Sequence, residues 1–135
     1  MKVFSFIERK IMPGRRTHML AGETAGVVVY GVIKRLKKEE WTLGGVLIAI
    51  VYGTLGGMLP DILEPAISSH HRQFCHSLLI AGIAYWGRDK FYKVLNLTFE
   101  QTEACNSFLI GYASHLVLDS ATPRSIPLGG KICIN

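Results

Sequence analysis

The chain has 135 residues, a length that fits a single domain over residues 1–135. Hydrophobic residues make up 49% and charged residues 19%, whereas an average soluble domain has about 25% charged residues. The net charge of +5 is gathered in short clusters beside apolar runs, such as Lys34 to Lys38. That placement suits lipid headgroups, or solvated loops, better than a continuous nucleic-acid groove, so we expect no nucleic-acid partner.

The cysteines indicate a reducing compartment. Cys75, Cys105 and Cys133 are far apart and odd in number, so they predict neither a disulfide framework nor thiolate zinc binding. Residues 1–16 lack the apolar core and the cleavage site of a signal peptide. Their mixture of apolar and basic residues favours an amphipathic helix on a membrane surface, or a first turn packed on the domain.

The first half of the chain predicts two long helices. Thr17 is a plausible N-cap for a helix over Thr17–Lys38, which closes on cations suited to a helix C-terminus. Thr42–Pro60 has no charged residue and approaches the roughly 20 apolar residues of a membrane span. It is the best transmembrane candidate in the chain, and we expect Pro60 to end it.

The second half predicts a loop and further helices. Residues 61–72 are interpreted as a loop, Phe74–Trp86 as a helix closed by Gly87, and residues 91–101 as a weak amphipathic helix. Thr102 is expected to cap a helix over 104–119 that ends before Pro123. No strand pattern is present, so the expected fold is all-α: one bundle of four to five helices, partly membrane-embedded or membrane-associated, with a metal site between helices.

Seven polar side chains lie at helix ends or on apolar faces, where burial without a partner costs several kcal/mol: His18, Asp61, His70, His71, His76, His115 and Asp119. A shared metal ion would compensate this cost. His115 and Asp119 are four residues apart and share one helix face, although a simple hydrogen bond or ion pair has the same spacing.

The other candidates are separated along the chain. His71 and His76 converge only if His71 lies in the loop and His76 in the first turn of the next helix, whereas His70 is the weaker candidate. Asp61 is a metal ligand or an N-cap, with Glu64 near enough to assist. His18 alone would be interpreted as an exposed histidine, and it becomes a candidate ligand only together with the other histidines and aspartates.

Several short motifs, in this order and spacing, resemble a bacterial family of membrane-bound metal-dependent hydrolases of the LexA-regulated, inner-membrane type. The resemblance covers roughly residues 17 to 128 and rests on His18, Leu59-Pro60-Asp61-Ile62, His71-Arg72, His76-Ser77-Leu78-Leu79 and Gly111-Tyr112-Ala113-Ser114-His115-Leu116 running into Asp119. The chain departs from the family pattern at Leu63, which replaces an aspartate, at Glu64, which replaces a histidine, and at Cys75, which replaces a threonine.

The resemblance implies a metal centre and a hydrolytic reaction. The metal ligands would be His18, Asp61, His71, His76, His115 and Asp119, a set of nitrogen and oxygen donors that suits two ions of zinc, manganese or iron better than one. Metal-activated water would be the nucleophile. Because the basic clusters favour anions, we expect a phosphoester substrate, in an anionic small molecule or, given the apolar surroundings, in a lipid or lipid-linked phosphate, with membrane lipid as a partner.

Arg72 is the candidate clamp for an anionic substrate group, since its planar fork matches phosphate. A surface arginine paired with Glu64 is the alternative. Two other functions remain open: a module that binds metal without an open coordination position, and a non-catalytic small membrane protein whose polar residues line a helix interface.

Overall fold

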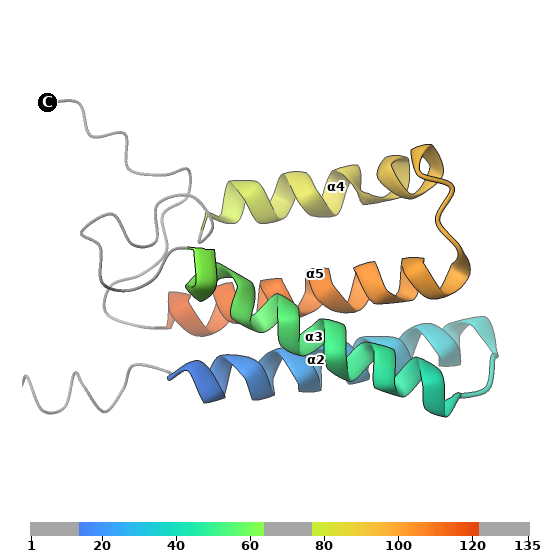
Figure 1. Cartoon of the computed structure of the whole chain (residues 1–135), viewed down its shortest axis with the longest axis horizontal. Coiled ribbons are helices and arrows are strands. Elements are labelled where there is room, and N and C mark those ends of the chain that lie inside the picture. The colour runs from blue at the N-terminus through green and yellow to red at the C-terminus, as the bar shows by residue number, and fades with distance from the viewer. Residues whose placement is uncertain (1–13, 64–76, 122–135) are drawn as a thin grey trace, which may run out of the picture.

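The computed structural model describes residues 14–63 and 77–121. These ranges contain four α-helices and no strand, so the expected all-α bundle is confirmed. The helices are α2 (Arg15–Lys37), α3 (Leu43–Leu63), α4 (Leu78–Val94) and α5 (Phe99–Ser120) (Figure 1). The predicted interfacial segment falls mainly on residues 1–13, outside the described ranges, as do Cys75, Cys133 and most of the predicted loop.

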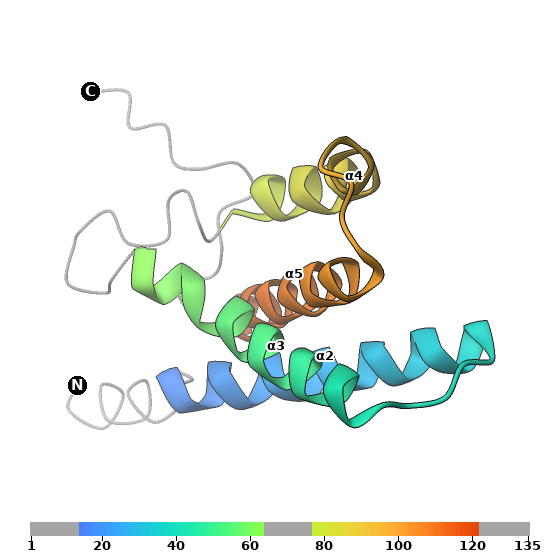
Figure 2. The same ribbon diagram turned by 45° about the vertical axis from the view of Figure 1, so that its right-hand side comes forward.

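Three of the helices form the core, and the fourth stands apart. Helices α2, α3 and α5 all contact one another, whereas α4 contacts only α5 among the described helices. Figures 1 and 2 both show α5 between α4 and α2, with α3 crossing the core. No residue of α4 is buried. Mutual packing therefore sets the positions of α2, α3 and α5, whereas α4 is attached through its contacts with α5.

Glycines bring the three core helices into backbone contact. An added Cβ at Gly111 of α5 would lie 3.0 Å from the Cα of Gly53 of α3. A Cβ at Gly53 would in turn lie 3.2 Å from the Cα of Gly26 of α2. The pairs Gly22/Gly26 and Gly53/Gly57 each have the four-residue spacing that lets helices pack closely in lipid. The core is thus held by close backbone approach, with few bulky side chains inside it.

Helix α3 has the length and hydropathy of a membrane span. It is 21 residues long, which gives roughly 31 Å of helix, about the thickness of the hydrocarbon layer. Its most apolar 18-residue window is only 28% buried. The core helix of a water-soluble protein would be mostly covered, so the exposed leucines and valines of α3 favour contact with lipid.

Two predicted features of the first two helices are wrong. Gly14, not Thr17, is the N-cap of α2, and the Thr17 N–H donates to the Gly14 carbonyl at 2.8 Å. Pro60 does not end α3, which continues to Leu63. Proline removes one backbone N–H, but Pro60 is fully buried near the end of the helix, where packing offsets the loss. Asp61 consequently lies on the last turn of α3 and not in a loop.

The boundaries of the last two helices also differ from those predicted. Helix α4 passes through Gly87 to Val94, so no separate helix begins at residue 91. The cap of α5 is Thr98, not Thr102, because Thr98 and Gln101 form a reciprocal capping box. Asn96, with a φ of 52°, makes the turn between the two helices. A glycine costs only about 1 kcal/mol inside a helix, which is too little to stop it.

An ion cluster around the buried Lys34 lies at the end of the core where α2 ends and α5 begins. The Lys34 ammonium lies 2.9 Å from a carboxylate oxygen of Glu39 and 2.9 Å from one of Glu103. It also lies over the Phe99 ring, 4.5 Å from the centroid. The hydrogen bond with Glu39 is the main reason that the pKa of Lys34 is raised. These charges fix how α2 meets α5 at the end of the bundle opposite Asp119.

Candidate metal centre

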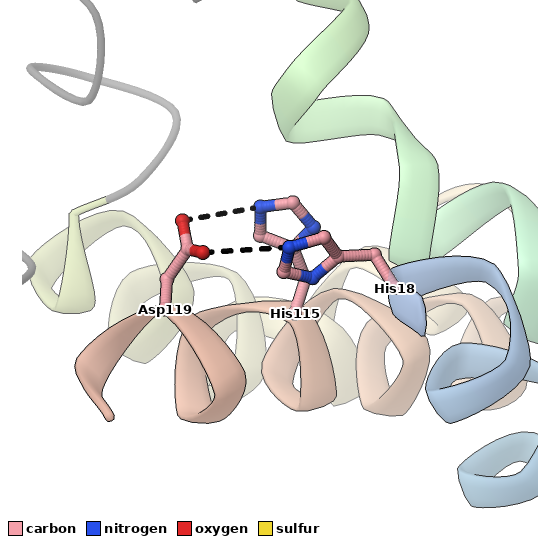
Figure 3. A group of neighbouring side chains, drawn as sticks. All are labelled: His18, His115 and Asp119. Carbon is pink, nitrogen blue, oxygen red and sulfur yellow. Dashed lines mark ion pairs between the residues drawn. The ribbon is translucent and has the colours of Figure 1, made fainter. Parts of the chain in front are cut away.

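A group of three buried side chains joins the start of α2 to the end of α5. His18 lies in the first turns of α2, and His115 and Asp119 lie one turn apart near the end of α5 (Figure 3). Their exposed fractions are 3%, 0% and 1%. Because α2 and α5 contact each other directly, residues almost a hundred positions apart in the sequence face one another.

The donor atoms of these side chains converge. His18 Nε2 lies 3.4 Å from Asp119 Oδ1, and His115 Nε2 lies 3.5 Å from Asp119 Oδ2. Asp61 adds a second carboxylate from the last turn of α3, with Oδ1 3.7 Å from His115 Nε2. The donor atoms of His18, His115 and Asp119 therefore all lie within 4.8 Å of one another, and Asp61 of a third helix lies beside His115.

A backbone carbonyl determines which nitrogen of His115 carries a proton. His115 Nδ1 lies 2.8 Å from the carbonyl oxygen of Gly57. A carbonyl only accepts hydrogen bonds, so Nδ1 is the protonated donor. In a neutral ring Nε2 then presents a lone pair towards Asp119 and Asp61. A lone pair facing two carboxylates is unfavourable unless a positive charge lies nearby, and a proton on Nε2 or a bound metal ion would each supply one.

The spacing of the donor atoms fits ligands of one metal ion. Zinc–ligand bonds of about 2.0–2.1 Å at tetrahedral angles place neighbouring donor atoms about 3.4 Å apart. The distances of 3.4 Å and 3.5 Å to Asp119 match this value. A strong hydrogen bond between a charged nitrogen and a carboxylate would be shorter, about 2.7–2.9 Å. The histidine rings stack at 3.9 Å between centroids, which keeps both Nε2 atoms on the same side.

Close packing of α2 on α3 determines this geometry. A Cβ at Gly57 would meet the carbonyl oxygen of His18 and would lie 3.2 Å from the Cα of Gly22. The absence of a side chain at Gly57 therefore lets the first turns of α2 approach α3. The same residue supplies the carbonyl that orients His115. The backbone of α3 thus fixes both histidines.

The structure brings together four of the predicted site residues: His18, Asp61, His115 and Asp119. The remaining predicted residues, Glu64, Arg72, His71, His76 and the weaker candidate His70, lie outside the described ranges. Leu63, the position at which the sequence resemblance led us to expect an aspartate, is 57% exposed at the end of α3.

The sequence-based prediction missed Gly57, whose contribution is a backbone carbonyl and a missing side chain. A carbonyl leaves no signature in the sequence, because every residue has one. The available signal was the Gly22/Gly26 and Gly53/Gly57 spacing, which predicts close approach of two helices. Combined with His18 four residues before Gly22, it would have placed that histidine against α3.

A family model described as YdjM inner membrane protein matches residues 12–129. The chain belongs to this family. Membership of the YdjM inner membrane protein family confirms the predicted location in the inner membrane, and α3 is long and apolar enough to span it. The matched region includes all four helices and all the residues of the candidate metal centre. No curated protein and no solved structure matches the chain.

Proposed function

We propose that this YdjM-family protein is a metal-dependent hydrolase of the inner membrane that acts on a phosphoester. The observation that carries the proposal is the set of donor atoms around His115. His18 and Asp119 lie at ligand spacing, Asp61 lies beside them, and the other ring nitrogen of His115 donates to Gly57. Metal-binding histidines characteristically donate their second N–H to a carbonyl or carboxylate in this way.

The four residues have distinct roles in the proposal. His18, His115 and Asp119 hold one divalent ion through the atoms that already converge, three ligands being usual for a catalytic zinc. Asp61, which is 29% exposed and thus the most accessible of the four, is the fourth ligand or the base that accepts a proton from water. The bound ion would supply Lewis acidity and lower the pKa of a water molecule.

Zinc, manganese and iron all suit this mixture of nitrogen and oxygen donors. Among the residues that the structure describes, His18, His115 and Asp119 supply candidate ligands for one ion. A second ion stays a prediction that depends on His71 and His76. Arg72, with its fork of N–H donors, remains the proposed clamp for the phosphate of the substrate, with Glu64 as its neighbouring acid. The location in the inner membrane favours a lipid or a lipid-linked phosphate as the substrate.

Burial favours a second candidate function, a non-catalytic membrane protein that binds metal structurally. His115 and Asp119 are almost inaccessible to solvent. A structural zinc has four protein ligands and no open position, and the two histidines with Asp61 and Asp119 make four. The two functions agree on metal binding and differ in hydrolysis.

Both candidate functions require a bound metal ion, and elemental mass spectrometry of the purified protein tests this requirement. The full chain is purified without added metal or nickel affinity, as wild type, His115→Ala and Asp119→Asn. We expect about one equivalent of a transition metal in the wild type and a clear loss in both variants. Glu40→Gln, which removes an exposed acid in the α2–α3 loop, is the control and should keep its metal. Wild-type protein without metal, even after reconstitution with zinc or manganese, would refute the metal centre.

Hydrolysis of a phosphodiester reporter separates the enzyme from the structural module. The enzyme should release product at a rate that falls on chelation, recovers with added metal and is lost in Asp61→Asn. Metal-loaded protein that shows no turnover on the reporter or on lipid phosphoesters would favour the structural module. Circular dichroism of each variant verifies that the helices persist.

A further inference from the structure

Two cavities lie beside α4, away from the candidate metal centre, among the residues that the structure describes. A cavity of about 570 Å³ lies between α4, α5 and α2, and another of about 500 Å³ lies between α4, α5 and α3. Both volumes fall in the range of small-molecule sites, about 300–1,000 Å³. Arg88, Tyr92 and Leu109 line both cavities, so the two meet beside the second half of α4.

The larger cavity is polar at one end and apolar at the other. Arg88, Asp89 and Tyr92 of α4 line the polar end together with Asn106 of α5, and the Tyr92 hydroxyl donates to the Asn106 side-chain oxygen at 3.0 Å. Ala81 of α4 and Ala113 of α5 line the other end. A molecule that fills this cavity must therefore combine a polar group with an apolar chain.

Helix α4 likewise changes from apolar to charged along its length. Leu78–Trp86 contains no charged residue, whereas the remainder carries three cations, Arg88, Lys90 and Lys93, against one acid. Trp86 lies at the boundary and is 90% exposed. Exposed tryptophans concentrate at the level of lipid headgroups, between the hydrocarbon layer and water. The pattern places Arg88 at headgroup level and Ala81 at the level of the acyl chains.

Arg88 retains donors for a phosphate. Its Nε lies 3.2 Å from Asp89 Oδ1, and Asp89 is the residue next in the chain, with a largely exposed side chain. Such an ion pair contributes little. A guanidinium has five N–H donors in a planar fork that matches phosphate oxygens. Asp89 and the Tyr85 side chain engage some of these donors, and the others remain for a phosphate. The guanidinium also lies 3.9 Å over the Tyr85 ring, which holds it at the mouth of the cavity.

We infer that the cavity between α4 and the core binds an anionic phospholipid, with its phosphate on Arg88 and an acyl chain running towards Ala81 and Ala113. This lipid is distinct from a substrate of the metal centre. Asn106 and His115 are separated by roughly 14 Å along α5, so a phosphate on Arg88 lies far from Asp119. The inference does not depend on the proposed hydrolase. The lipid would supply the apolar contacts that attach α4 to the core.

Native mass spectrometry of the full chain in detergent tests the inference. Phosphatidylglycerol, phosphatidylethanolamine and glycerol phosphate are titrated separately. We expect phosphatidylglycerol to stay bound in preference to the zwitterionic lipid, and glycerol phosphate, which has no acyl chain, not to bind. Equal retention of both lipids would show ordinary boundary lipid and overturn the inference. Binding of glycerol phosphate with the affinity of the lipid would show a phosphate site without an acyl chain, which also overturns it.

Two pairs of variants locate the site. Arg88→Gln should weaken phosphatidylglycerol binding about tenfold, as expected for one charge-assisted hydrogen bond. Lys90→Gln removes the same charge from the exposed face of α4 and should change binding by less than about twofold. Ala81→Phe fills the apolar end and should also weaken binding, whereas Leu79→Phe, at an exposed position outside both cavities, should not.

Equal effects of Arg88→Gln and Lys90→Gln would mean that the lipid responds only to net charge, and the site would be rejected. A dimer that excludes lipid in the wild type would show that a second copy of the chain occupies the cavity, which also overturns the inference. Circular dichroism confirms that each variant remains helical. The metal content of Arg88→Gln should equal that of the wild type, so a failure here is distinguishable from a failure of the metal centre.

Discussion

Replacing Gly57 by alanine adds one methyl group at a point where the backbones of α2 and α3 are in contact. The new Cβ would meet the His18 carbonyl oxygen and would lie 3.2 Å from the Cα of Gly22 and 3.3 Å from the carbonyl carbon of His18. All of these are backbone atoms, which cannot rotate away as a side chain can. Ordinary carbon contacts are about 3.5–4.0 Å, so the helices must separate by several tenths of an ångström or more.

Two opposing contributions determine the change in stability. Forcing a methyl group into a packed core costs about 1–3 kcal/mol. Alanine in place of glycine inside a helix returns up to about 1 kcal/mol. We therefore expect Gly57→Ala to destabilise the protein by about 1–2 kcal/mol. Gly44→Ala is the matched control in the same helix, because a Cβ at Gly44 meets nothing within 4 Å; it should be neutral or slightly stabilising.

Gly57→Ala should also weaken the binding of the proposed metal ion. The methyl group moves His18 away from Asp119, and it disturbs the peptide whose carbonyl accepts from His115. Loss of such outer contacts typically costs 10–100-fold in metal affinity. Thermal unfolding in detergent and zinc competition with a fluorescent chelator measure the two effects. If Gly57→Ala matched Gly44→Ala in both assays, the reasoning from close helix packing would be wrong.

Three further predictions concern other parts of the bundle. Thr98→Ala removes the side-chain N-cap of α5 and should lower the free energy of unfolding by about 1 kcal/mol, measured by thermal unfolding; a change near zero would contradict a stabilising cap. Tyr92→Phe removes the hydrogen bond to Asn106 and should speed hydrogen exchange of the backbone amides in α4 about fivefold, without affecting the other helices. An equal increase in exchange in all four helices would contradict the conclusion that α4 is attached separately from the core. The hydrogen bond from Lys34 lowers the pKa of Glu39 below 4.5, so the ionised form stabilises the fold above pH 4.5, and this contribution disappears as pH falls through the lowered pKa. Glu39→Gln should therefore show a smaller loss of melting temperature between pH 7 and pH 3 than the wild type, and an equal loss would contradict the ion pair.

The existence of the helices could be predicted from the sequence, but several ends could not. Apolar periodicity and charge-free length identified α3, whereas Pro60 and Gly87 were expected to end helices that continue past them. Each of these residues costs a helix a fixed local amount. Whether the helix survives that cost depends on contacts made by residues elsewhere in the chain, as at the fully buried Pro60.

In the candidate metal centre, too, some residues could be predicted from the sequence and others could not. Chemistry and spacing identified His18, Asp61, His115 and Asp119, because imidazoles and carboxylates on apolar helix faces need a partner. They did not identify the Gly57 carbonyl or the contact of Lys34 with Glu103. Lys34 and Glu103 are ordinary residues for the ends of amphipathic helices. Only the antiparallel approach of α2 and α5 makes them a buried pair.

The glycine contacts of the core have a consequence for how the protein assembles in a bilayer. In lipid the hydrophobic effect does not draw helices together, and close backbone packing takes its place. Helix α3, without a charged residue before Asp61, can insert alone and then act as the template on which α2 and α5 dock. His18 and His115 meet only once both have docked. The contact between these two histidines therefore forms only in the complete bundle, and a metal ion bound there, as we propose, would tie the start of α2 to the end of α5.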